Sequence, residues 1–68
     1  MAGRKPKYRD EVILKEFIDS DDPVLTTKEI SKTFGYSSPG AYQRLVDLES
    51  EGLLKSKRVG RALAWWIT

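Results

Sequence analysis

Two adjacent side chains near the middle of the chain, Gln43 and Arg44, carry paired hydrogen-bonding groups. An arginine fork can bond O6 and N7 of guanine, and a glutamine amide can bond N6 and N7 of adenine, each pair being worth about 1–3 kcal/mol of discrimination. Both residues follow the small residues Gly40 and Ala41, which would let a helix end approach a groove closely. The spacing predicts base recognition, and the alternative for Arg44 is an ion pair with Asp47 on a solvated helix face.

The residues around this pair could contact phosphate. Ser37 and Ser38 can cap a helix, and their hydroxyls and the free N–H groups beside them can also meet a phosphate. Pro39 suits the first helical position, because its missing N–H has no partner there in any case. Tyr42 could donate to a phosphate or stack on a sugar, and it could equally pack against neighbouring elements of the protein.

Basic side chains are concentrated near the C-terminal end. Residues 53–68 contain four bases and no acid. We expect Lys57, Arg58 and Arg61 to contact the DNA backbone or the minor groove, and the alternative is a charged hairpin edge that prevents aggregation. Lys28 is a further candidate for a phosphate contact from the preceding helix.

Charge is segregated along the chain, although its net value is only +2. Residues 1–9 contain four bases and no acid, and residues 10–22 contain six acids and one lysine. Two basic ends around an acidic middle indicate a polyanion bound at two places. We interpret residues 1–7 as a flexible basic arm, with a solubility tail as the alternative.

The composition argues against catalysis and against a metal or cofactor. The 68 residues include no cysteine and no histidine, which removes the thiolate ligands, the commonest general base and the commonest transition-metal ligand. Stability must therefore come from the packing of one small domain. No apolar run approaches the ~20 residues that span a bilayer, and the first residues lack the apolar region of a secretory signal. We expect a cytoplasmic protein that is not an enzyme.

Periodicity and capping residues divide the rest of the chain into elements. Thr26 and Glu29 form a capping box, Gly35 ends the helix that follows it, and Gly52 ends the next one. The predicted order is a helix at 8–20, an edge pairing at 24–25, helices at 27–34 and about 38–51, and strands at 53–58 and 63–67 joined around 59–62. This order predicts a single α+β domain over residues 8–68.

The predicted core is a set of large apolar residues. Its members come from the three helices and the last strand, and they are Leu14, Phe17, Ile18, Ile30, Leu45, Leu48 and Trp65. Because strand residues alternate between faces, Trp66 should point outward if Trp65 points inward. An outward Trp66 indicates either packing beneath the first helix or a partner surface.

Residues 25–68 resemble the winged helix-turn-helix domain, most closely that of multiple-antibiotic-resistance-type prokaryotic regulators. The matching residues are Leu45, Leu48, Glu49, Gly52 and Leu53 at the end of the recognition helix, Gly60 and Arg61 at the wing tip, and Trp65, Ile67 and Thr68 in the closing strand. In this family an apolar residue is common where Arg44 stands, which implies that Arg44 is partly turned inward.

The resemblance implies a three-helix winged helix-turn-helix with a short strand and a C-terminal β-hairpin wing. It further implies a small transcriptional regulator, a repressor, that binds double-stranded DNA sequence-specifically. The helix at 38–51 would lie in the major groove, and the hairpin at 53–67 would lie on the backbone or the minor groove. A homodimer on a palindrome, paired through the first helix or Trp66, fits the small footprint of one domain, and no small-molecule ligand is evident. The alternative is a protein–protein adaptor that uses Trp66 and the acidic first helix.

Overall fold

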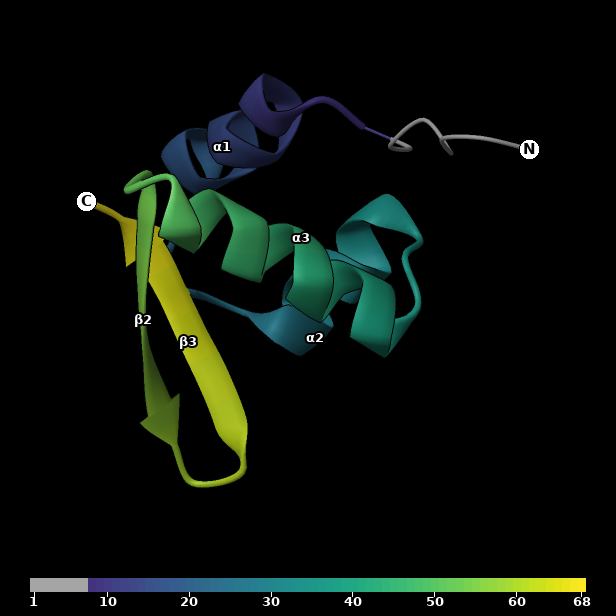
Figure 1. Ribbon diagram of the computed structural model, residues 1–68, viewed down its shortest axis with the longest axis vertical. Helices are drawn as coiled ribbons and strands as arrows, with labels where there is room; N and C mark the ends of the chain where they lie inside the picture. Colours follow the sequence, from purple (N-terminus) through teal and green to yellow (C-terminus); the bar gives the residue numbers. More distant parts are fainter. Residues whose placement is uncertain (1–7) are drawn as a thin grey trace.

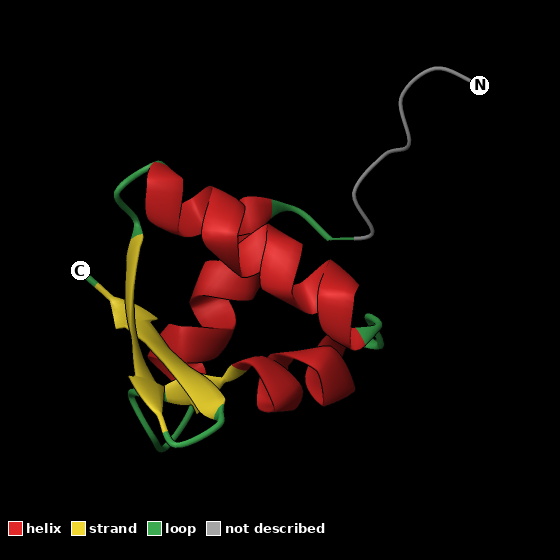
Figure 2. Cartoon of the chain, turned by 60° about the horizontal axis from the view of Figure 1, so that its bottom comes forward, coloured by secondary structure: helices red, strands yellow, loops and turns green. Residues whose placement is uncertain are grey.

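The computed structural model describes residues 8–68, which form three helices and a three-stranded antiparallel sheet in an α+β arrangement. The elements are α1 (Asp10–Asp19), β1 (Leu25–Thr26), α2 (Thr27–Phe34), α3 (Ser38–Ser50), β2 (Leu54–Val59) and β3 (Ala62–Ile67) (Figure 1). The strands lie on one side of the helices (Figure 2). This element order confirms the prediction, and the basic arm predicted for residues 1–7 lies outside the described residues. None of the helices in the described part is long and apolar enough to cross a membrane.

One side of α1 is buried, and that side does not include Ile18. Ile13 and Phe17 are buried, and Leu14 packs partly buried against the same cluster. The prediction of Ile18 as a core residue was wrong, because its side chain is 71% exposed. Successive helical residues are rotated by about 100°. The core contacts the row from Ile13 to Phe17, so the neighbouring row that begins at Leu14 reaches solvent in the last turn.

The predicted capping residues start and stop α2 and α3. The Glu29 N–H donates to Thr26 Oγ1 at 3.1 Å, and Glu29 Oε1 accepts from the Thr26 N–H at 2.8 Å, which completes the capping box. Gly35 ends α2 with φ of 72°, a left-handed conformation that glycine adopts without steric penalty. Ser37 is the N-cap of α3. Pro39 is the second helical residue instead of the first, where its missing N–H is equally harmless.

The central strand of the sheet is β3, in the order β1-β3-β2. The edge pairing predicted at 24–25 occurs one residue later, with Leu25 opposite Trp65. A two-residue loop, Gly60 and Arg61, joins β2 to β3 and is shorter than the predicted connection. Gly60 has φ of 62°, and no other type of residue in the described chain has a positive φ. A glycine with positive φ at the first loop position is typical of a type II′ turn, which matches the twist of a hairpin.

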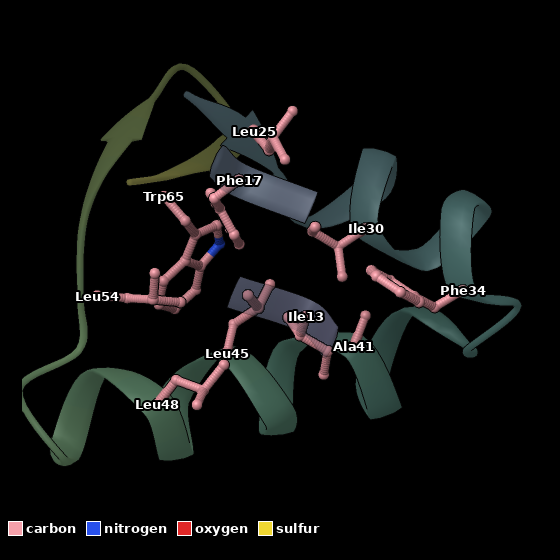
Figure 3. Packing of buried hydrophobic residues seen from close by; sticks show 10 residues of the cluster. All are labelled: Ile13, Phe17, Leu25, Ile30, Phe34, Ala41, Leu45, Leu48, Leu54 and Trp65. Carbon is pink, nitrogen blue, oxygen red and sulfur yellow. The ribbon is translucent and has the colours of Figure 1, made fainter. Parts of the chain in front are cut away.

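The core is built around Trp65, which is 1% exposed (Figure 3). Its indole N–H donates to Thr27 Oγ1 at 2.8 Å, which connects the central strand to the first turn of α2. The stripe of Ala41, Leu45 and Leu48 faces this cluster from α3, as the sequence predicts. The tryptophan therefore fixes the sheet against both helices.

The β2–β3 hairpin has two unlike faces. Leu54 is buried against the helices, and the Ser56 hydroxyl donates to Glu49 Oε2 of α3 at 2.8 Å. Because strand residues alternate, Lys55 lies on the outer face, directly opposite Trp66. Trp66 is partly exposed there, and Trp65 is buried on the other face, as predicted.

Candidate nucleic-acid interface

An open groove lies between the first turns of α2 and α3 and the tip of the β2–β3 hairpin. Its lining consists of Thr26, Thr27, Lys28, Ser38, Pro39, Tyr42, Val59, Arg61, Ala62 and Leu63. Lys28 and Arg61 are the charged residues of this lining, so its charge is positive. The groove brings together five of the predicted site residues, Lys28, Ser38, Pro39, Tyr42 and Arg61.

The start of α3 explains why residue 40 is a glycine. The Gly40 N–H donates to the hydroxyl of the N-cap Ser37 at 3.2 Å. A Cβ at position 40 would lie 3.1 Å from that same oxygen and 3.9 Å from the side chain of Tyr36. The glycine therefore leaves room for the cap, in addition to any clearance that it provides for a ligand.

The basic residues of the hairpin have no acidic partners. Within residues 8–68, the ion pairs are Arg9–Glu11, Lys15–Asp19 and Arg44–Asp10, and none involves the hairpin. Arg58 shares the helix-facing side of β2 with Leu54, whereas Lys57 lies on the outer face opposite Ala64. The structure thus separates two residues that the sequence placed in one site.

Tyr42 packs against a neighbouring element, which is one of the two roles considered for it. Its ring packs edge-on against Trp65, with ring centroids 6.3 Å apart. The side chain is nevertheless 46% exposed and lines the groove. The contact with Trp65 holds the ring in place, while the exposed part remains accessible to a ligand.

Gln43 is exposed on α3 outside the groove lining. Its Nε2 donates to Asp47 Oδ1 at 2.9 Å, one helical turn along. An exposed hydrogen bond of this kind contributes about 1 kcal/mol or less, so a better partner can replace it. Asp47 therefore pairs with Gln43 and not with Arg44, the partner considered from the sequence.

Arg44 is turned toward the N-terminal end of α1. Its Nη2 atom donates to Asp10 Oδ1 at 2.7 Å and to the backbone oxygen of Tyr8 at 2.9 Å. The side chain of Arg44 is only 16% exposed, whereas that of Asp10 is 42% exposed. The predicted base contact would require the guanidinium to leave these partners.

The electrostatics of Arg44 agree with a structural role. Burial disfavours its charged form, but interactions with Asp10 and Tyr36 outweigh burial and raise the pKa of Arg44 above its ordinary value. The charged form of Arg44 is therefore favoured over its neutral form more strongly in the folded chain than in water. The inward orientation implied by the family resemblance is the one signal in the sequence that anticipated this contact.

The sequence did not indicate that Tyr8 belongs to the same region. Its ring packs against Phe34 and Tyr36, with centroid distances of 4.8 and 6.0 Å, and its N–H donates to the Tyr36 hydroxyl at 3.2 Å. These contacts hold the chain before α1 beside the connection between α2 and α3. Only the composition of this stretch, an aromatic residue at the end of a basic run, could have suggested an anchor.

Thr27 is another residue of the groove that the sequence did not single out. The capping box does place it at the first position of α2, but its contact with Trp65 depends on residues 38 positions apart. Leu63, Val59 and Ala62 enter the groove through the position of the hairpin.

Comparison with models of protein families, with curated proteins and with solved structures found no match to this chain.

Proposed function

We propose that this chain binds double-stranded DNA sequence-specifically as a small transcriptional regulator with a winged helix-turn-helix fold. In this proposal α2 and α3 are the helix-turn-helix, and the β2–β3 hairpin is the wing. The observation that carries it is the groove, where the first turn of α3 and the hairpin tip meet with Lys28 and Arg61 as the charged residues. A DNA duplex presents one phosphate backbone on each side of its major groove, and the basic side chains of Lys28 and Arg61 could contact these backbones.

The parts of the groove have different roles in this proposal. Lys28, Ser38 and the free N–H groups at the start of α3 bind one phosphate backbone, and Arg61 at the hairpin tip binds the other backbone or the minor groove. The 13 residues of α3 extend about 20 Å, enough to enter a major groove about 12 Å wide with the N-terminal turns. Gln43 reads base edges, and Arg44 supports the helix from behind. With this function we expect the protein in the cytoplasm.

The salt dependence of binding tests the proposal. If the chain neutralises about five phosphates, the logarithm of the association constant should fall against the logarithm of the salt concentration with a slope of about −4.5. Fluorescence anisotropy with labelled random duplexes measures this slope, and selection followed by sequencing gives the preferred site. A slope near zero would contradict the proposal.

Two variants separate phosphate contacts from base contacts. Arg61→Ala should weaken binding to all sequences and reduce the steepness of the slope by about 1, whereas Gln43→Ala should change the base preference. Lys15→Ala is the matched control, because it removes a cation from α1, at the end of the molecule opposite the hairpin tip (Figure 1). Equal effects of the Arg61 and Gln43 variants on every sequence would disprove these assignments.

The alternative function, a protein–protein adaptor, is favoured by one observation. Trp66 and Ile67 line an apolar hollow away from the groove. An adaptor would show no affinity for duplex DNA at any salt concentration, so the same titration distinguishes the two functions.

A further inference from the structure

A second surface lies at the end of β3 that is distant from the hairpin tip. It is an apolar hollow lined by Phe17, Pro23, Val24, Trp66 and Ile67. Phe17 comes from α1, and the proline and valine come from the connection between α1 and β1. Trp66 is five residues from Arg61, or about 17 Å along an extended strand. The hollow and the groove can therefore be occupied at the same time.

The hollow is surrounded by apolar side chains that remain in contact with solvent. Val24 is 38% exposed and Ile67 is 37% exposed, and the strongly exposed Ile18 belongs to the same last turn of α1 as Phe17. These exposed apolar residues lie next to one another around the hollow, where a partner could cover them. The hollow is thus suited to an apolar partner.

Opposite charges lie on the two sides of Trp66. On the β2 side, Lys55 is directly opposite Trp66 in the strand register. On the β1 side, Asp22 Oδ1 accepts at 3.1 Å from the N–H of Val24, which is one of the residues that line the hollow. Within the described residues, neither Asp22 nor Lys55 forms an ion pair. The face therefore has an apolar centre with an unpaired acid on one side and an unpaired base on the other.

This arrangement is complementary to itself. In a dimer with two-fold symmetry, the same patch meets its own copy, and a residue on one side of the axis contacts the residue on the other side. An axis through Trp66 would bring Asp22 of each copy to Lys55 of the other, with the two apolar centres in contact. We propose that this face pairs two copies of the chain in solution. The proposal does not depend on DNA binding, because the hollow and the groove share no lining residue.

Self-association of the full chain without DNA is the direct measurement. Sedimentation velocity over a range of concentrations up to about 1 mM should show a reversible, weak dimer, as expected for a small interface. In ¹H–¹⁵N spectra recorded over the same dilution series, the amide signals of Val24 and Lys55 and the indole signal of Trp66 should shift together. A monomer at the highest concentration would overturn the proposal.

Charge reversal tests which face is used. Asp22→Lys and Lys55→Glu should each raise the dissociation constant of the dimer by about tenfold or more, since each change creates two like-charge contacts per dimer. The double variant Asp22→Lys/Lys55→Glu should restore the wild-type constant to within about threefold, because the swapped charges again pair.

Lys32→Glu is the control for these variants. It makes the same change of charge as Lys55→Glu but on α2, outside both the hollow and the groove, and it should leave the dimer unchanged. All four variants change exposed residues, and thermal unfolding confirms that each is folded. A dimer that resists both single reversals, or a double variant that stays monomeric, would assign the interface to another surface. DNA titrations of the same variants report separately on the groove.

Discussion

Arg44 combines a charged end with a largely buried position, and its contacts decide what it can do. The guanidinium bonds Asp10 and the backbone oxygen of Tyr8, so it joins α3 to the start of α1. A charge that loses its partner inside a protein is more destabilising than the same site filled by an apolar side chain. In the proposed function the residue contributes to DNA binding indirectly, by holding the helix that carries Gln43.

The first prediction follows from this pair. Asp10→Ala should lower the free energy of unfolding by about 1 kcal/mol, a value reduced from the buried-pair range because Asp10 is partly exposed. Arg44→Met in the Asp10→Ala background should recover most of this loss, because an apolar side chain needs no partner there. Urea unfolding of the two variants measures the difference. DNA affinity of the double variant should remain near wild type, and a selective loss of guanine recognition would instead show that Arg44 contacts bases.

At the level of elements, the starts of α2 and α3 are determined by short capping motifs. Thr26 and Glu29 satisfy each other's N–H groups, and Ser37 caps α3. Gly40 weakens α3 by about 1 kcal/mol in helix propensity. The absence of a side chain at this position leaves space beside the Ser37 hydroxyl and reduces the width of the helix at its first turn. The N-cap of α3 and, in the proposed function, the entry of this helix end into the major groove of DNA therefore both favour a glycine at position 40.

A substitution at Gly40 separates these two reasons. Gly40→Leu should change the free energy of unfolding by less than about 1 kcal/mol, since the gain in helix propensity offsets the displaced cap, and it should abolish DNA binding. Ser37→Ala is the control, because it removes the cap without adding bulk. It should destabilise the chain by about 1 kcal/mol. It should retain DNA binding, because Ser37, unlike Ser38, does not line the groove and its hydroxyl is bonded to the Gly40 N–H. If the two variants lose DNA affinity equally, the cap and not the bulk is responsible.

For the whole molecule, the groove exists only because the sheet is held against the helices. The hydrogen bond from Trp65 to Thr27 connects the central strand to α2, and Tyr42 packs on the same indole ring. The angle between the hairpin and α3 therefore depends on the contacts of this tryptophan together with the Ser56–Glu49 hydrogen bond between β2 and α3. The hollow at the other end of β3 depends on the same strand.

Removal of this hydrogen bond should affect stability and binding together. Trp65→Phe and Thr27→Val should each lower the free energy of unfolding by about 1–3 kcal/mol, because a buried polar group loses its partner or a cavity forms. The double variant should lose less than the sum of the two, as expected for residues in contact. Both single variants should also weaken DNA binding, because the hairpin tip is no longer held at a fixed distance from α3. Additive losses would show that the contact does not couple the two elements.

Local sequence patterns determined the elements of this protein. The capping box, the glycine after α2, the helical period of Ala41 and Leu45 and the alternation in β3 act over a few residues, so their consequences can be read directly from the chain. The excess of basic residues in the hairpin is equally a property of composition. These signals were sufficient to predict the α+β class and the order of the helices and strands.

Only the tertiary structure decided which side chains share a surface. The partners of Arg44 are 34 and 36 positions away, and Trp65 and Thr27 are 38 positions apart, so no local pattern specifies these contacts. The same applies to Ile18, whose exposure depends on where the core ends. Packing placed Arg58 on the helix-facing side of β2 and Lys57 on the outer face, although the two are neighbours in the chain. Successive strand residues point to opposite sides, and the packing of the helices on one side decides which of them face the core.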